Sequence, residues 1–531
     1  TASGTSLGLE IVDCIFARNQ VGLQARAGDD QSLNLTVKDC VISDFTDASF
    51  NLLPAPRLML LEKGLSFWAT GSGSLPPLMA VNLEGPTTSG SFATMLMNPT
   101  GPVGNDVFGL NNYQNNTFTR LVEVYVRGHE SRREYPELPG GATQSVPEVV
   151  LHVGGGIWDG QAIANPDGGW DLGLYAVADK PSGSSFGTNN YLCRYRVDLT
   201  GTRIEEMRAV GVYAEVNQDC RGMVALGDET RIERTGQQAS SSPDGFRHSG
   251  VYALARRGLL QLLGNRAMIL DNVGCGIYYI ALKTGRGPLP FGGFLGLKQC
   301  GIHQNGEDGM HLLAATATPT LSRDQTGAIV GGTWDLALSP YQFSFVPDSG
   351  KPSDAGISEQ GQGYLNRCAI SGGEGSKIGI HLSVDGTGGS AAGFPHQDYA
   401  AASLRVVNTY VWGFQQEGYR ADITSPTILL QGAALFTPIV HSTFANNVGY
   451  SFNIVHNPVG GSGYTFYNLE PGASGKYLNT SLNNCLFQRS VSSDPDLGPF
   501  LDTNSQSTAR WKFDDGVNYS DRNKVYLAGL R

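Results

Sequence analysis

A short phrase that begins with glycine returns along the chain, and the residues at its second position are of types that could do chemistry. In chain order they are Tyr213, Tyr252, Tyr278, His311, His381 and Arg420. Aromatic faces stack on sugar rings, while histidine and arginine could serve an acidic polysaccharide as base and charge clamp. The row is therefore a candidate glycan-binding surface. The alternative is that the row is a ladder of solvent-facing side chains that binds no ligand, because tyrosine is common in β-strands for packing reasons alone.

Two carboxylates stand next to this row, in the run Asn-Gly-Glu-Asp-Gly-Met. Glu307 and Asp308 are candidate calcium ligands, because calcium prefers carboxylate oxygens, although such a run is also an ordinary turn. Lys298 could supply the basic residue that a lyase requires. No Cys-x-x-Cys, phosphate loop or Ser-His-Asp order stands out. The sequence thus predicts no cofactor, with calcium as the one metal ion for which it offers ligands.

The glycine phrase itself predicts the element that positions the row. Its copies begin at Gly22, Gly211, Gly250, Gly276, Gly309, Gly379, Gly418 and Gly449. Positions one, three and five after the glycine are apolar or small, which is the period of a strand with one buried face. The second and fourth positions should therefore face outward, into solvent.

A second phrase precedes the first in most copies and carries a cysteine or threonine in a fixed slot. The slot holds Cys14, Cys40, Cys300, Cys368 and Cys485, and Thr409 and Thr443 also fill it. Because cysteine and threonine replace each other in this slot, we predict an internal ladder of small buried side chains in which the cysteines are free thiols and form no disulfides. With polar turn residues between the phrases, one unit reads as strand, turn, glycine, strand. A repeated unit that cannot bury its own face predicts a stack of coils.

These phrases carry a resemblance to a known architecture. The runs "DCIFARNQVGLQA", "KQCGIHQNGEDGMHLLA" and "HSTFANNVGYSFNI" resemble the right-handed parallel β-helix superfamily of pectate lyases, polygalacturonases and phage tailspikes. The resemblance implies an all-β solenoid with long loop inserts. Polygalacturonase-like enzymes carry Asn-Thr-Asp, a paired Asp and Gly-His-Gly. Here Gly-His-Gly is missing, and the nearest Asp pair, Asp514 and Asp515, lies beyond the regular repeats. The resemblance therefore carries architecture more than chemistry.

We expect one elongated domain, since a solenoid of 531 residues can exceed the usual domain size. The predicted parts are a parallel β-helix over 1–490, with irregular coils at 46–200, regular coils at 203–490, inserts at about 283–295, 315–362, 385–402 and 456–478, and a cap or linker at 491–531.

One interval between repeat glycines can be interpreted in two ways. Between Gly309 and Gly379 lies either one very long loop or an extra coil near Gly332, which would place His311 and His381 at ~5 Å or ~10 Å.

Composition limits the class of protein. A net charge of −11 without a basic stripe argues against nucleic-acid binding and fits an extracellular or cell-surface protein. No apolar run approaches the ~18 residues of a membrane span. Thr1 is not an initiator, so we expect a piece of a larger parent protein, with self-association as a further possibility.

Two hypotheses about function follow. The first is a β-helical segment of a large extracellular or cell-surface protein with a structural, adhesive or glycan-contacting role. The second is a polysaccharide lyase or glycoside hydrolase acting on an acidic polysaccharide along the row. The missing catalytic signatures favour the first.

Overall fold

The structure is a computed structural model of the whole chain. It describes residues 5–12, 14–17, 23–27, 31–38, 41–43, 65–71, 78–84, 120–128, 132–134, 143–145, 148–159, 172–179, 193–207, 209–217, 220–236, 248–256, 258–282, 293–315, 318–319, 322–323, 329–331, 334–335, 342–343, 363–385, 400–425, 433–449, 451–458, 464–465, 478–483, 485–489 and 526–528. Gly22, Cys40, most of each predicted insert and nearly all of 491–531 lie outside these residues.

The described residues form strands and turns, with no helix among them. In the three long sheets the strands pair in parallel almost throughout, in the order of a parallel β-helix and consistent with the right-handed superfamily, which confirms the predicted all-β solenoid. The exception among the described strands of these sheets is an antiparallel pair of Val455–His456 with Tyr464–Thr465. The chain divides into two compact units. The first holds Thr1–Ala253, Gly258–Leu260 and Leu321–Gly332, and the second holds Leu254–Arg257, Gln261–Thr320 and Thr333–Arg531.

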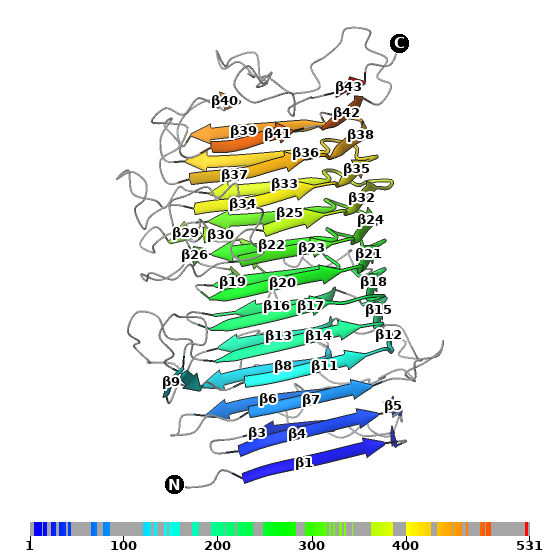
Figure 1. Ribbon diagram of the computed structural model, residues 1–531, viewed down its shortest axis with the longest axis vertical. Helices are drawn as coiled ribbons and strands as arrows, with labels where there is room; N and C mark the ends of the chain where they lie inside the picture. Colours follow the sequence, from blue (N-terminus) through cyan, green and yellow to red (C-terminus); the bar gives the residue numbers. More distant parts are fainter. Residues whose placement is uncertain are drawn as a thin grey trace. The chain divides into compact units, whose positions relative to one another are not determined.

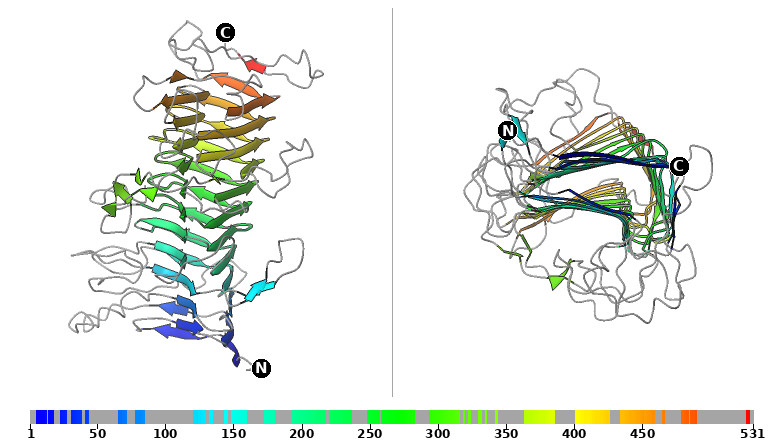
Figure 2. Two further views of the ribbon diagram at one scale, coloured as in Figure 1. Left: turned by 90° about the vertical axis from the view of Figure 1, so that its left-hand side faces the viewer. Right: turned by 90° about the horizontal axis from the view of Figure 1, so that it is seen from below.

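A coil with three strands is illustrated by β14 (Arg194–Thr200), β15 (Arg203–Glu205) and β16 (Val210–Val216). We name the three sheets that result the long-strand, short-strand and glycine-strand sheets. Successive strands of one sheet lie side by side (Figure 1). In the end-on view, strands of the three sheets face a shared interior (Figure 2). The predicted unit, with two strands, was therefore one strand short.

The other strands of the first unit fall into the same three sheets or into small pairs. In the long-strand sheet lie β1 (Thr5–Val12), β4 (Gln31–Lys38), β7 (Leu78–Glu84), β11 (Glu148–Gly154) and β17 (Arg221–Leu226). In the short-strand sheet lie β12 (Ile157–Asp159) and β18 (Arg231–Glu233). In the glycine-strand sheet lie β3 (Leu23–Ala27), β6 (Leu65–Gly71), β8 (Arg120–Gly128) and β13 (Leu172–Asp179). The small pairs are β2 (Ile15–Ala17) with β5 (Val41–Ser43), β9 (Arg132–Glu134) with β10 (Thr143–Ser145), and β27 (Ser322–Arg323) with β28 (Ile329–Gly331).

The division between the units falls within β19 (Val251–Arg256) and β20 (Leu259–Asn265). The long-strand sheet of the second unit holds β23 (Gly293–Lys298), β31 (Gly363–Asn366), β34 (Ala400–Val407), β37 (Ala433–Val440) and β41 (Leu478–Asn483), with β30 (Gln342–Phe343) beside β34. Its short-strand sheet holds β21 (Met268–Leu270), β24 (Gly301–Asn305), β32 (Ala369–Gly372), β35 (Tyr410–Trp412), β38 (Thr443–Asn447), β42 (Leu486–Arg489) and β43 (Tyr526–Ala528).

The glycine-strand sheet of the second unit carries the basic end of the row. It holds β22 (Ile277–Leu282), β25 (Met310–Ala315), β33 (Ile380–Asp385), β36 (Tyr419–Ser425), β39 (Phe452–Pro458) and β40 (Tyr464–Thr465). A small pair is formed by β26 (Thr318–Pro319) and β29 (Trp334–Asp335). Because β25 pairs directly with β33, no coil separates them in this sheet, and the ambiguous step between Gly309 and Gly379 is resolved.

The predicted alternation is clearest on β33, where Ile380, Leu382 and Val384 are buried and the residues between them are half-buried. On β22 and β25 the positions between the core residues are largely buried as well. Ile277, Tyr279 and Ala281 on β22 are fully buried, as are Met310 and Leu312 on β25. Coil-to-coil pairing puts like positions in contact, so these side chains form continuous apolar layers. The core of the second unit therefore follows from the period of two in the glycine phrase.

The repeat glycines form a column where successive coils come closest. A Cβ on Gly276 would lie 2.6 Å from the carbonyl oxygen of Gly309, and one on Gly309 would lie 2.7 Å from that of Gly379. The last copy was assigned to the wrong glycine, because Tyr419 pairs with Phe452 and so Ser451, not Gly449, continues the column. That error is an even number of residues, so the predicted inward and outward faces of β39 are unchanged.

The cysteine slot lies at the corner between the long-strand and short-strand sheets. Cys300, Cys368 and Cys485 are buried free thiols, and Cys14 is a half-buried one. Ser442, and not Thr443, continues the slot, because Thr443 is the first residue of β38 and pairs with Tyr410. The slot is thus a ladder of small side chains, as expected. Cys40 lies outside the described residues.

At Cys300, Cys368 and Thr409 the corner turns on a residue in the left-handed region. Immediately before the slot, Gln299 has φ 55°, Arg367 φ 57° and Asn408 φ 49°. Side chains other than glycine adopt this conformation at a cost, so the corner is imposed by the coil stack. The second phrase, read as a single strand, in fact spans two strands and this corner.

A charge cluster covers part of the short-strand sheet in the first unit. The buried carboxylate of Glu233 accepts a hydrogen bond from Arg203 Nε at 2.7 Å and contacts Arg231 at 2.9 Å and Arg234 at 3.2 Å. Arg234 also binds Glu205, which lies on the preceding coil. The cluster joins neighbouring coils through their side chains.

Candidate functional site

In the first unit the row consists of stacked tyrosines. The rings of Tyr213 and Tyr252 lie parallel, with centroids 5.3 Å apart and an interplanar angle of 7°. Tyr175 extends the stack, 5.1 Å from Tyr213. Each of the three rings is only 1% exposed. Their strands are buried on both faces, so none of the three rings is open to solvent.

In the second unit the row is in register across four coils. Tyr278 pairs with His311, His311 with His381, and His381 with Arg420. The Tyr278 ring meets the His311 ring edge-on at 5.0 Å, and the two imidazoles stack with centroids 4.0 Å apart. Tyr278 is 7% exposed and His311 is 4% exposed, so the expectation that this position faces solvent was wrong for them. The coil stack thus brings together residues from distant parts of the chain.

The ring of His381 is held between two carboxylates. Its Nδ1 lies 2.8 Å from Asp308 Oδ2, and its Nε2 lies 2.8 Å from Asp422 Oδ2. Burial by itself would lower the pKa of His381, but the hydrogen bonds to Asp308 and Asp422 outweigh burial and hold the pKa above its usual value. The two carboxylates thus stabilise the imidazolium form of His381 relative to a free imidazole.

Asp422 joins His381 to Arg420 at the more exposed end of the row. Arg420 Nε donates to both Asp422 oxygens, at 3.1 and 2.9 Å, and Nη2 donates to Oδ1 at 3.1 Å. Burial would raise the pKa of Asp422, but hydrogen bonds from His381 and Arg420 hold it below its usual value. The Arg420 side chain is 31% exposed and that of Asp422 is 23% exposed. Arg420 is therefore a neutralised guanidinium, and a poor clamp for a further anion.

A buried carboxylate lies on the far side of Arg420. Glu417 Oε1 is 3.5 Å from Arg420 Nη1 and accepts a hydrogen bond from Asn453 Nδ2 at 3.0 Å. The row is thus flanked by the three carboxyl groups of Asp308, Glu417 and Asp422 and by the guanidinium of Arg420.

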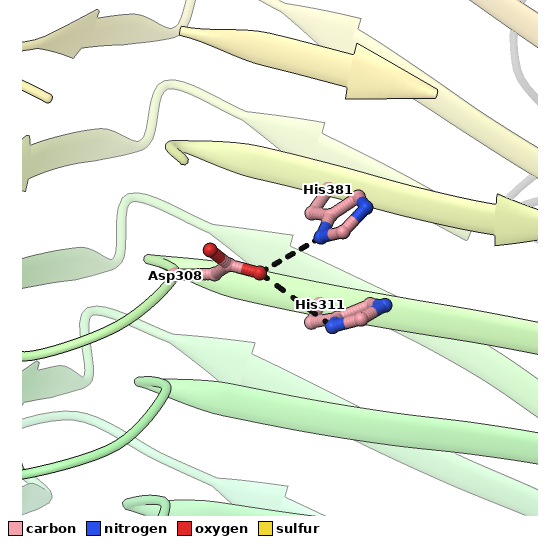
Figure 3. Close-up of side chains that lie close together, drawn as sticks. All are labelled: Asp308, His311 and His381. Atoms are coloured by element: carbon pink, nitrogen blue, oxygen red, sulfur yellow. Dashed lines mark hydrogen bonds and ion pairs between the residues drawn. The ribbon is translucent and has the colours of Figure 1, made fainter. Parts of the chain in front are cut away.

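His311 is fixed by a different set of partners. Its Nδ1 lies 3.5 Å from Asp308 Oδ2, and its Nε2 lies 2.9 Å from Ser383 Oγ. Ser383 Oγ also lies 3.4 Å from His381 Nε2. Asp308 is consequently shared by both imidazoles, as Figure 3 shows.

Glu307 and Asp308, the candidate calcium pair, serve different partners. Asp308 is buried against the two imidazoles, whereas Glu307 lies 3.4 Å from Lys377 Nζ and within 3.8 Å of the Cys275 thiol. Nitrogen donors surround Asp308, and calcium prefers oxygen. The surroundings of Asp308 therefore suit a softer ion than calcium.

Sequence reasoning missed Ser383, Glu417 and Asp422. Ser383 and Asp422 occupy the fourth position of the glycine phrase, one outward step beyond His381 and Arg420. Reading the fourth position down the stack would have found both. Glu417 precedes Gly418 at the turn, just as Asp308 precedes Gly309. Acidic residues immediately before the repeat glycine were the available signal.

No family model, curated protein or solved structure matches the chain. Within the described part of the chain, no helix has the length and apolarity needed to cross a membrane.

Proposed function

We propose that the chain is a β-helical segment of a large extracellular or cell-surface protein, with a structural or adhesive role. The burial of the aromatic row supports this proposal. Tyr213 and Tyr252 are 1% exposed and stack on each other, so their faces are engaged by neighbouring coils. A platform for sugar rings needs an open aromatic face. The ladder instead stabilises the stack of coils, which is what a spacer or adhesive shaft requires.

Contact with a glycan, under this proposal, is limited to the exposed end of the row in the second unit. Arg420 and Asp422 are partly open there, and they are charge-paired with each other. The carboxyl groups of Asp308, Glu417 and Asp422 beside the row disfavour polyuronates and other anionic chains, most strongly at low ionic strength. A neutral, hydroxyl-rich glycan is the better match, because paired charges can still exchange hydrogen bonds with hydroxyl groups.

The enzymatic alternative rests on one specific observation, which is the placement of His381 between Asp308 and Asp422. An imidazole oriented by a carboxylate is the usual apparatus of general acid–base catalysis. A lyase for an acidic polysaccharide also needs a cation for the substrate carboxylate, and Arg420 is already occupied by Asp422. For this reason we favour the scaffold role.

One experiment separates the two. The full chain is incubated with neutral oligosaccharides and with polyuronates, and both binding and product formation are measured. We expect weak binding of neutral glycans at most, reduced in Arg420→Ala and unchanged in Arg196→Ala, an exposed arginine of the first unit. Release of unsaturated uronate products or new reducing ends that His381→Ala abolishes would overturn the scaffold role.

A further inference from the structure

Three potential metal ligands converge on the outer side of the glycine-strand sheet in the second unit. One oxygen of Asp308 and one ring nitrogen each of His311 and His381 lie within 4.8 Å of one another. They come from the turn before β25, from β25 itself and from β33 (Figure 3). We propose that these three side chains bind a divalent transition-metal ion of the Zn²⁺ type. This inference does not depend on glycan binding.

The partners of the opposite ring nitrogens are those of metal-binding histidines. His381 Nε2 is 2.8 Å from Asp422 Oδ2, and His311 Nε2 is 2.9 Å from Ser383 Oγ. A histidine that ligates a metal through one nitrogen usually donates the other N–H to a carboxylate or another oxygen, which fixes the ring and its tautomer. With both Nε2 atoms engaged, both Nδ1 atoms remain directed at Asp308. The hydrogen-bond partners that would orient both histidine ligands are thus present in the structure.

The donor set selects the class of ion. Two imidazole nitrogens and one carboxylate oxygen suit Zn²⁺, Co²⁺, Ni²⁺ or Fe²⁺, whereas calcium takes six to eight oxygens. Three protein ligands leave a position for water, as in catalytic rather than structural zinc sites. Burial favours uptake too, since the side chains of Asp308 and His311 are each 6% exposed and so are shielded from competing solvent.

The distances show what must move on binding. In a tetrahedral zinc site the ligand atoms lie roughly 3.3 Å apart. The 3.5 Å between His311 and Asp308 fits this value, whereas the 2.8 Å between His381 and Asp308 must open by about half an ångström. The ion takes the place of the hydrogen bond between His381 and Asp308. Because the stacked rings are only 21° from parallel, one of them must also tilt so that both lone pairs face the ion.

Metal binding would fasten one coil to the next. Asp308 and His311 belong to one coil and His381 to the next, and a long segment of chain separates β25 from β33. A bond network across that junction closes a long loop in the folded state. We therefore expect the ion to raise the thermal stability of the chain, because an ion that binds only the folded state stabilises it by mass action.

The test uses the full chain, stripped with a chelator and dialysed. Co²⁺ is titrated and followed by its visible absorption, and Zn²⁺ affinity is measured by competition with a chromophoric chelator. We expect one ion per chain and a rise in melting temperature. Asp308→Asn, His311→Gln and His381→Gln should each abolish saturable binding. Asp422→Asn should weaken it about 10- to 100-fold, as loss of an outer partner does.

The matched control is His303, a histidine of the same unit on the short-strand sheet. Its Nδ1 lies 2.8 Å from Ser371 Oγ on the next coil, so it has a similar serine contact without belonging to the three-ligand group. His303→Gln should leave binding unchanged. Wild-type protein that takes up neither Co²⁺ nor Zn²⁺ overturns the proposal, whatever the folding of the variants. Displacement of Zn²⁺ by equimolar Ca²⁺ overturns the assignment of nitrogen ligands.

Discussion

The imidazoles of His311 and His381 are stacked, with centroids 4.0 Å apart, and both contact the same oxygen of Asp308. Stacked imidazoles that share a carboxylate hold one charged and one neutral ring more easily than two charged rings, because like charges at this distance repel. The pair therefore couples the electrostatics of two coils. The residues that pack against this histidine pair also contribute to the stability of the stack.

Tyr278 is the first neighbour to test, because its ring packs edge-on against His311. Tyr278→Ala should destabilise the chain by about 3 kcal/mol, since it removes a buried aromatic side chain. Tyr278→Phe should cost less than about 1 kcal/mol, because the packing stays. Urea unfolding followed by tryptophan fluorescence measures both. Equal, negligible effects would mean that the outer face of the sheet is open after all.

The repeat glycines give a prediction with an internal control. Gly309→Ala places a Cβ 2.7 Å from the carbonyl oxygen of Gly379, so the coils must separate, at a cost of about 1–3 kcal/mol. Gly8→Ala has no atom within 4 Å of the new Cβ and should be close to neutral. Both changes are read from the midpoint of urea unfolding. A neutral Gly309→Ala would contradict the close approach of the coils.

The left-handed corners predict opposite effects of two substitutions at one site. Arg367 has φ 57°. Arg367→Val should destabilise by about 1–2 kcal/mol, because a β-branched side chain is strained there. Arg367→Gly should be neutral or slightly stabilising, since glycine adopts this conformation without strain. Thermal melts of the two variants, compared with the wild type, decide the sign.

Glu233 predicts a pH dependence in the first unit. Burial would raise its pKa, but the hydrogen bond from Arg203 and the charges of Arg203, Arg231 and Arg234 hold it below the usual value of 4.5. A lowered carboxyl pKa stabilises the fold above the pKa of the unfolded chain, and that contribution is lost as pH falls through the folded pKa. Glu233→Gln should therefore cost about 1–3 kcal/mol at pH 7.

The difference between wild type and Glu233→Gln should shrink below about pH 4.5. Denaturant unfolding at a series of pH values measures it. Arg196→Ala, at an arginine whose side chain is 51% exposed, is the surface control and should cost less than about 1 kcal/mol. A gap for Glu233→Gln that stays constant down to the acid range would contradict the lowered pKa.

Thiol reactivity tests the slot ladder. The hydrogen bond to Cys300 and burial raise the pKa of the Cys368 thiol well above its usual value, so the thiolate that reacts is scarce. Cys368 and Cys485 should resist alkylation in native buffer and react in denaturant, whereas half-buried Cys14 should react earlier. Peptide mapping after timed labelling measures this order. Quantitative disulfide formation among the slot cysteines would contradict the ladder.

The architecture could be predicted because its signals are local. The alternation around Ile277 and the glycine before it fall within one strand, and a period of two is legible in six residues. The pairing of His381 with Asp422 depends instead on which coil follows which. The entropic cost of closing a loop grows only slowly with its length. A long loop between β25 and β33 was therefore as acceptable as an additional coil. Only the register of β25 on β33 places His311 on His381.

Two further features were hidden for a different reason. Gln299 adopts a left-handed conformation that its own residue type does not favour, so the corner, and with it the third strand of each coil, left no signal in the second phrase. The burial of Tyr278 depends on what lies over the sheet, which strand periodicity does not report. Both are properties that the stack imposes on individual residues.

The column of repeat glycines also bears on how such a chain can lengthen. Because Gly309 has no side chain, the carbonyl oxygen of Gly379 can lie close to its Cα. Each coil therefore contributes a glycine to one neighbouring coil and a carbonyl oxygen to the other. A duplicated coil brings its own glycine and its own carbonyl, and it fits between its parents without further change. A duplicated segment that is not a whole number of coils would place a residue with a Cβ at the position of the repeat glycine. Gene duplication in whole coils is therefore the route of growth that this geometry leaves open.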